Sequence, residues 1–148
     1  MNKLLFLFIP LFFACNKDSN ISTLDELQIG DFHEGGIIFY LGGSGNSGMV
    51  VTAADIAIAN WWEAVEIVEN HSSGGFNDWQ LPTIYQLQQI YDTVGQSGGN
   101  SGNFEMSKYW SSTLHSGNNG YAFNFGTGES NIGWNGILNC RVRAILSF

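Results

Sequence analysis

Apolar runs near both ends of the chain predict β-strands. Residues 36–41 and 49–52 are compact β-favouring runs joined by a Gly-, Ser- and Asn-rich segment, which is typical of an antiparallel hairpin. Residues 137–146 predict one closing strand, and its side chains alternate between two faces. Cys140, Val142, Ala144 and Leu146 fall on one face, and Arg141, Arg143 and Ile145 fall on the other. We expect the first and last strands to pair.

Two further runs in the last third of the chain also alternate. Residues 109–113 and 120–125 each predict a strand, and Tyr121, Phe123 and Phe125 share one face of the second. Between these runs and the N-terminal hairpin, the apolar period changes from two residues to that of a helix.

Two helices are predicted in the middle of the chain. The first carries an apolar stripe of Trp61, Ala64, Val65 and Val68, and the second carries one of Ile84, Leu87, Tyr91 and Val94. Thr83 and Gln86 have the spacing of a capping box at the start of the second helix, and Gly95 is placed to end it. Helices confined to the middle and strands at both ends predict an α+β domain.

The N-terminus has the pattern of a cleaved secretory signal. Lys3 precedes an unbroken apolar run from Leu4 to Phe13, which is too short to span a bilayer. Ala14 followed directly by Cys15 resembles the lipobox of bacterial lipoproteins, in which the cysteine becomes the acylated N-terminus. The alternative is an ordinary signal cut a few residues later. We expect a signal peptide at residues 1–14, a polar tether at 15–28 and a folded domain at 29–148, held by lipid in the cell envelope, at the outer membrane or cell surface.

Charge and cysteine content narrow the possible partners. The formal net charge is −8, and Lys3 leaves with the signal, so the mature chain carries 13 acidic side chains against 4 basic ones. Such a chain repels nucleic acid and sulfated polymers unless the sign is locally reversed. If Cys15 is acylated, Cys140 is the only remaining thiol, so stability must come from a packed core without a disulfide.

Several motifs together resemble one family. Gly75-Phe-Asn-Asp-Trp-Gln-Leu-Pro-Thr83, Tyr109-Trp-Ser-Ser-Thr113 and Arg141-Val-Arg143 are similar, in this order, to the C-terminal domain of the Legionella collagen-like adhesin and its secreted relatives. Residues 30–40 are similar to the start of the versions in Bacteroidetes lipoproteins. The resemblance implies a fold related to C-type lectins and to the formylglycine-generating enzyme: two helices on a small twisted antiparallel sheet with long loops. The best-known member binds glycosaminoglycans, which the acidic balance of this chain disfavours.

Most of the motif residues have a structural interpretation. Trp79 and Leu81 suit the core, Pro82 and Thr83 suit the start of a helix, and Trp110 suits burial. Contact with a ligand is the weaker alternative for these residues. For Arg141 and Arg143 we expect an ion pair with an acidic side chain on a neighbouring strand.

The segment from His115 to Asn135 is the predicted ligand-binding region. Amides and exposed rings suit a neutral sugar, because amides bond hydroxyls and a ring packs on the C–H face of the sugar. The alternative is that Asn and Gly serve left-handed turns there. The candidate ligand-binding residues are His115, Asn118, Asn119, Tyr121, Glu129, Asn131, Trp134 and Asn135.

No pattern in the sequence points to catalysis or to a cofactor. His33, His71 and His115 lack metal-ligand spacing, and no nucleophile elbow is present. The paired active cysteines of the formylglycine-generating relatives cannot be supplied by Cys140 alone. We therefore expect a non-enzymatic, monomeric lectin-like module that attaches cells to a glycan or glycoprotein, without metal or nucleic acid. The alternative is a scaffolding lipoprotein that binds another envelope protein.

Overall fold

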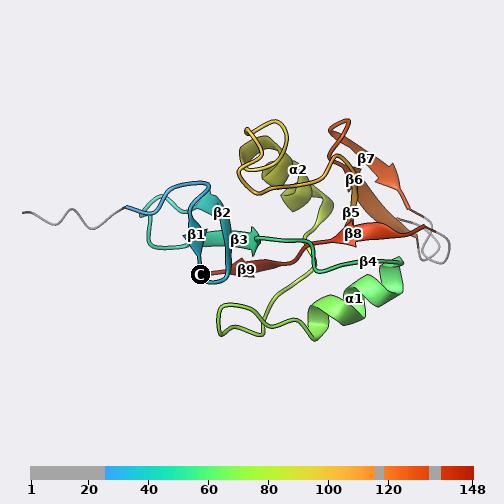
Figure 1. The fold of residues 1–148 in the computed structure, drawn as a ribbon, viewed down its shortest axis with the longest axis horizontal. Helices are drawn as coiled ribbons and strands as arrows, with labels where there is room; N and C mark the ends of the chain where they lie inside the picture. The colour runs from blue at the N-terminus through green and yellow to red at the C-terminus, as the bar shows by residue number, and fades with distance from the viewer. Residues whose placement is uncertain (1–25, 116–118, 134–137) are drawn as a thin grey trace, which may run out of the picture.

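Two helices and nine strands build the part of the chain that the structure describes. The structure is a computed structural model, which describes residues 26–115, 119–133 and 138–148. The elements, in chain order, are β1 (Phe32–His33), β2 (Gly36–Leu41), β3 (Gly48–Thr52), β4 (Ala57–Ala59), α1 (Trp61–Glu69), α2 (Ile84–Thr93), β5 (Lys108–Leu114), β6 (Gly120–Asn124), β7 (Glu129–Ile132), β8 (Cys140–Val142) and β9 (Ile145–Ser147). The α+β class predicted from the sequence is confirmed (Figure 1).

The strands form two sheets in place of the single sheet that was expected. One has the order β1-β2-β3-β9 and the other β4-β8-β5-β6-β7. Neighbouring strands are antiparallel, except that β5 and β8 run parallel. The closing strand predicted at residues 137–146 is therefore wrong, because β8 ends at Val142 and β9 begins at Ile145 in the other sheet.

The C-terminal strand does join the N-terminal hairpin. Met49, Val50 and Val51 of β3 pair with Ser147, Leu146 and Ile145 of β9. The predicted pairing of the first and last strands is therefore wrong for β2, because the last strand pairs with β3, the second strand of the hairpin. β1, β4 and β7 were not predicted, since each is short and β7 is mostly polar.

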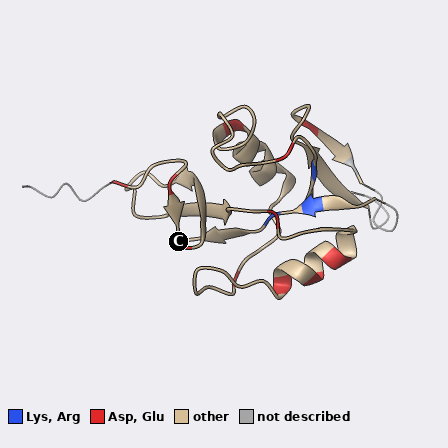
Figure 2. Cartoon of the chain, in the orientation of Figure 1, with Lys and Arg blue, Asp and Glu red and all other residues tan. Residues whose placement is uncertain are grey.

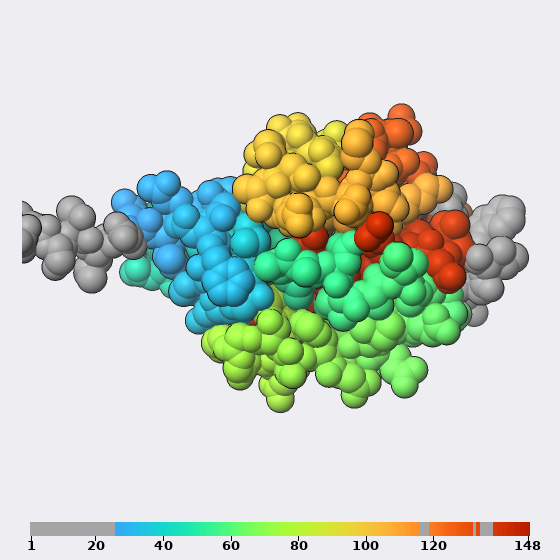
Figure 3. All heavy atoms as spheres, viewed as in Figure 1, coloured from blue at the N-terminus to red at the C-terminus, as the bar shows by residue number. Residues whose placement is uncertain are grey.

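The helices cover opposite faces of the strands, α2 on one side and α1 on the other (Figure 1). The α1 side buries a cluster that includes Ile38, Trp61, Trp79, Trp110 and Val142, and the α2 side buries one that includes Phe39, Leu87, Tyr109, Phe123 and Ile145. Neighbouring residues of β2, Ile38 and Phe39, enter different clusters, as alternation along a strand requires. In the space-filling view, red patches of the C-terminal residues show between the yellow-orange layer above and the green layer below (Figure 3).

Both helices begin with a capping box. In α2, the Thr83 side chain accepts a hydrogen bond from the Gln86 backbone, and the Gln86 side chain accepts one from the Thr83 backbone, as predicted. Asn60 and Glu63 do the same for α1. The C-cap of α2 is Val94, one residue before the predicted Gly95. Within the described ranges, neither helix is long and apolar enough to cross a bilayer.

Candidate binding groove beside helix α2

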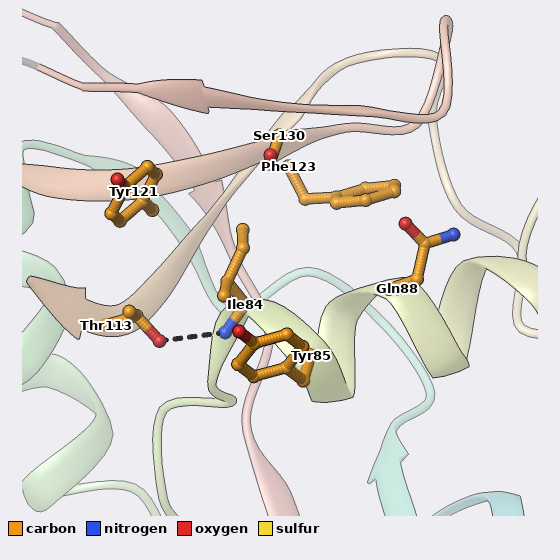
Figure 4. A pocket seen from close by; sticks show the side chains of 7 residues that line it. All are labelled: Ile84, Tyr85, Gln88, Thr113, Tyr121, Phe123 and Ser130. Atoms are coloured by element: carbon orange, nitrogen blue, oxygen red, sulfur yellow. Dashed lines mark hydrogen bonds between the residues drawn. The ribbon is translucent and has the colours of Figure 1, made fainter.

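A groove of about 440 Å³ lies between α2 and the outer strands of the larger sheet. Tyr85 and Gln88 reach it from the helix, and Tyr121, Phe123 and Ser130 reach it from β6 and β7 (Figure 4). We call it the α2 groove. Its lining residues are Ile84, Tyr85, Gln88, Thr113, Tyr121, Phe123 and Ser130.

The sequence of α2 leaves its groove-facing side chains available. Leu87 and Ile90 are fully buried and hold the helix on the sheet, so Tyr85 and Gln88 fall outside the core. Tyr85 is 83% exposed, the largest value among the exposed large hydrophobic residues described. A tyrosine this exposed has little role in packing, which makes it available to a ligand.

The sheet side of the groove follows from strand alternation. Tyr121 and Phe123 are two residues apart on β6, and Phe123 pairs with Ser130 of β7, so all three face α2. At the closed end, the Ile84 backbone N–H donates to Thr113 Oγ1 at 3.0 Å, which fixes the start of the helix to β5 (Figure 4).

The groove offers neutral hydrogen-bonding groups and rings. Tyr85, Tyr121, Thr113 and Ser130 contribute hydroxyls, and Gln88 contributes an amide whose nitrogen donates to both Asp92 carboxylate oxygens at 3.2 Å. None of the seven lining residues carries a charge. Hydroxyls both donate and accept, so this set can match a ligand rich in hydroxyl groups.

The structure divides the ligand-binding set predicted between residues 115 and 135. Tyr121 lines the groove, and its ring lies 5.4 Å from that of His115, whose backbone N–H donates to the Asn119 carbonyl at 2.6 Å. Asn131 pairs with Ala122 and Glu129 pairs with Asn124, so both side chains fall on the face of the sheet opposite Tyr121. Asn118, Trp134, Asn135 and the predicted lipidation site Cys15 lie outside the described residues.

A cluster around Asp55 explains the two arginines near the C-terminus. The Asp55 carboxylate accepts from Arg141 Nη1 and from Arg143 Nε, both at 2.6 Å. The predicted ion pairs are confirmed, although Asp55 lies in the turn between β3 and β4 and not on a strand. Asp55 thus holds two of the three basic side chains in the described ranges, and the third is Lys108 (Figure 2).

The Arg143 guanidinium is enclosed by the protein. Its side chain is 1% exposed and donates to the carbonyls of Thr52, Gly102 and Asn103 at 2.5, 3.1 and 2.9 Å. It also lies 4.2 Å from the centre of the Phe104 ring. The sequence predicts Arg143 and Ile145 on one face of a single strand. In the structure, Arg143 lies between β8 and β9, and its side chain turns into the interior.

Burial shifts the pKa of two groups near this cluster. Desolvation raises the pKa of the Tyr109 hydroxyl to about 12, and that hydroxyl accepts from the Glu105 backbone N–H at 2.9 Å. Desolvation also raises the pKa of the Cys140 thiol to about 11, so the thiol is protonated at neutral pH. Both are structural groups rather than reactive ones.

The most recognisable motifs contact each other and build the junction between the helices. Trp79 and Leu81 are buried and Thr83 caps α2, as predicted; Pro82 is buried too, and its carbonyl accepts from the Ser112 backbone at 2.8 Å. The buried Trp110 donates through its indole to the Ala59 carbonyl at 2.8 Å. The Pro82 contact joins residues 79–83 to β5, and the Trp110 contact joins β5 to β4.

A model of the Lcl C-terminal domain matches residues 44–145 of the chain. The chain belongs to the Lcl C-terminal domain family. This is a family of secreted, adhesin-like surface domains, in agreement with the resemblance carried by the motifs. Comparison with curated proteins found no match.

In this Lcl domain, a second groove of about 340 Å³ lies on the α1 side of β5, which we call the α1 groove. Ser112 borders it, whereas the next residue, Thr113, borders the α2 groove. The α1 groove has an apolar floor with three polar residues beside it. Its lining residues are Trp61, Val65, Val68, Glu69, Trp79, Gln80, Leu81 and Ser112.

Of the seven residues that line the α2 groove, only Tyr121 was predicted as a ligand-binding residue. The sequence placed Ile84 and Phe123 on the apolar faces of a helix and a strand, and it assigned no ligand-binding role to Tyr85, Gln88, Thr113 or Ser130. Only Tyr85 carried a signal, since it is an aromatic residue on the polar side of an amphipathic helix. In the described ranges of this Lcl domain, no group of three or more His, Cys, Asp or Glu residues could hold a metal ion.

Proposed function

We propose that this Lcl domain is a non-enzymatic attachment module, held on the cell envelope by lipid at Cys15, that binds glycan in the α2 groove. The observation that carries the proposal is the groove itself, in which the tyrosines of α2 and β6 accompany three neutral polar side chains. Family membership supports a role at the cell surface.

The chemistry of the lining favours binding over catalysis. Among the described residues that line the α2 groove there is no Asp, Glu, His, Lys or Cys, so the Thr113 and Ser130 hydroxyls have no general acid or base in the lining to activate them. Sugars, in contrast, are held by hydroxyl and amide hydrogen bonds together with packing on aromatic rings.

A glycan array probed with the purified domain tests the binding site. Tyr85→Ala and Tyr121→Ala should each weaken binding to the glycans that the wild type recognises, by about three- to tenfold. Tyr40→Ala is the matched control, because Tyr40 is 42% exposed and belongs to β2 of the other sheet. The proposal fails if no glycan binds, or if the Tyr40 variant loses as much affinity as the Tyr85 variant.

Lipid attachment is tested separately. We expect a Cys15→Ser variant to leave the membrane fraction and to lose incorporation of a radiolabelled or clickable fatty acid. A variant that remains lipidated would contradict the assignment of Cys15. The nearby Ser19→Ala substitution serves as a control, since it leaves the Ala14–Cys15 junction unchanged.

The α1 groove supports the second candidate function, binding of another envelope protein. Its floor holds Trp61, Trp79 and Leu81, and the neighbouring Trp62 is 54% exposed with its ring 4.9 Å from that of Trp61. Exposed tryptophan beside an apolar groove is typical of protein interfaces. Co-purification of one envelope partner that is lost in Trp62→Ala and kept in Tyr85→Ala would favour this function over glycan binding.

A further inference from the structure

We infer that the α2 groove selects uncharged glycans and rejects sulfated and carboxylated ones. This inference rests on the proposed function and specifies its ligand class. It depends on where the fold places its few positive charges and on which charge lies beside the groove.

The two arginines are held by contacts within the domain. Arg141 and Arg143 each donate to Asp55 at 2.6 Å, and Arg143 is further enclosed by three backbone carbonyls. Extracting Arg143 for a ligand would leave Asp55 without its buried partner, and breaking such a pair is strongly unfavourable. Both guanidinium groups are therefore committed to contacts within the domain, and the single negative charge of Asp55 offsets one of their two positive charges.

The remaining cation in the described ranges faces away from the groove. Lys108 pairs with Asn124 across β5 and β6, and Asn124 pairs with Glu129 across β6 and β7. Directly paired residues share a face, so Lys108 lies in one row with Glu129. Tyr121 and Phe123 belong to the opposite face, which is the face that lines the groove.

A negative charge lies beside the groove. Gln88 lines the groove, and its amide nitrogen donates to both oxygens of Asp92, one turn further along α2. An anionic group placed beside Gln88 would approach this carboxylate, and none of the described lining residues is a cation that could compensate. Repulsion between two negative charges in close proximity weakens binding by about tenfold or more where water is partly excluded.

The groups that remain fit a neutral sugar ring. The hydroxyls of Tyr85, Tyr121 and Ser130 can exchange hydrogen bonds with sugar hydroxyls, and the tyrosine rings can pack on C–H faces. Because no ion pair contributes, affinity should depend little on ionic strength.

Matched polysaccharides with and without sulfate test the inference. The probes are dextran, mannan and galactan, each beside its chemically sulfated form, with binding of the full mature chain measured at low and high NaCl. We expect the neutral form to bind at least about tenfold more tightly, with less than about a twofold change between the two salt concentrations. Tyr85→Ala should reduce that binding, and Tyr40→Ala should not.

A gain-of-charge variant provides the second measurement. Ser130→Lys places a cation on the exposed edge strand β7 beside the groove, and it should bring salt-sensitive binding of the sulfated forms, whereas Ser72→Lys, in the loop after α1, should not. Tighter binding of sulfated probes by the wild type, or binding that falls steeply with salt, would overturn the inference and leave glycan binding standing. Failure of the folded wild type to bind any neutral or sulfated probe would overturn both.

Discussion

The Asp55 cluster makes a specific prediction about stability. Asp55→Asn keeps the shape of the side chain but removes the negative charge that Arg141 and Arg143 share. Arg143 is 1% exposed, and the Asp55 side chain is 18% exposed, so the contact between them is largely shielded from water. Leaving a buried guanidinium without its partner costs about 3–5 kcal/mol, whereas the more exposed Arg141 contact contributes about 0–1 kcal/mol.

This loss is a large part of the stability of a domain of this size, which is typically about 5–15 kcal/mol. We expect the melting temperature, measured by circular dichroism, to fall by about 10 °C. The midpoint of unfolding in guanidinium chloride should fall as well, with no change in the dependence of the unfolding free energy on denaturant concentration. Asp78→Asn is the control, because Asp78 is exposed and forms no ion pair within the described residues. An Asp55→Asn protein within about 1 kcal/mol of wild type would refute the reasoning.

Three further predictions concern local packing and titration. Gly120→Ala should destabilise the domain by about 1–3 kcal/mol, because a Cβ there would collide with the Trp61 indole, whereas Gly43→Ala meets no atom within 4 Å and should be neutral in the same melts. In a variant lacking the N-terminal cysteine, Cys140 should resist Ellman's reagent at pH 8, because the thiol is buried and burial raises its pKa to about 11. It should react once guanidinium chloride unfolds the protein. Rapid reaction of the folded protein would contradict the burial of Cys140. Burial lowers the pKa of His71 below 6.5, and its buried Nε2 has no hydrogen-bond partner among the residues that the structure describes. The unfolded chain therefore takes up a proton first as pH falls, and wild type should lose stability between about pH 7 and 5 relative to His71→Phe. Parallel pH profiles for these two proteins would show that the environment of His71 is wrongly described.

Local chemistry made the helices predictable. The apolar stripe of α1 and the reciprocal bonds of Thr83 and Gln86 depend on residues within one or two turns of each other. The end of α2 was missed by one residue because Gly95 has a packing role: a Cβ there would meet the Tyr91 backbone and the Phe125 ring. Glycine at the end of a helix can be required for space as well as for dihedral angle.

The strands were predictable where they are long and not where distant pairing creates them. β4 contains only Ala57–Ala59 and exists through its pairing with β8, more than 80 residues later. The break between β8 and β9 arises because Arg143 finds Asp55 and three carbonyls, a set assembled from segments far apart in the chain. Alternation of apolar and polar residues alone could not show that the residues before and after Arg143 enter different sheets.

The candidate site shows the same limit. Sequence reasoning grouped residues that are close along the chain, whereas strand alternation separates Tyr121 from Asn131 and Glu129. The other wall comes from Tyr85 and Gln88, more than 30 residues earlier, and it required the position of α2 over the sheet. The amides and aromatic rings of residues 115–135 did predict one property of the groove, since its lining is neutral, polar and aromatic.

The passage of the chain from β8 to β9 affects how this domain unfolds and how it responds to proteolysis. Residues 140–147 supply a strand to each sheet, and Arg143 anchors the crossing point between them. The smaller sheet takes its fourth strand, β9, from the far end of the chain, so a single cut between β3 and β9 divides that sheet between two fragments, and the proteolytic halves should not survive as independent folding units. We expect hydrogen exchange in β3 and β5 to report one shared opening event rather than two.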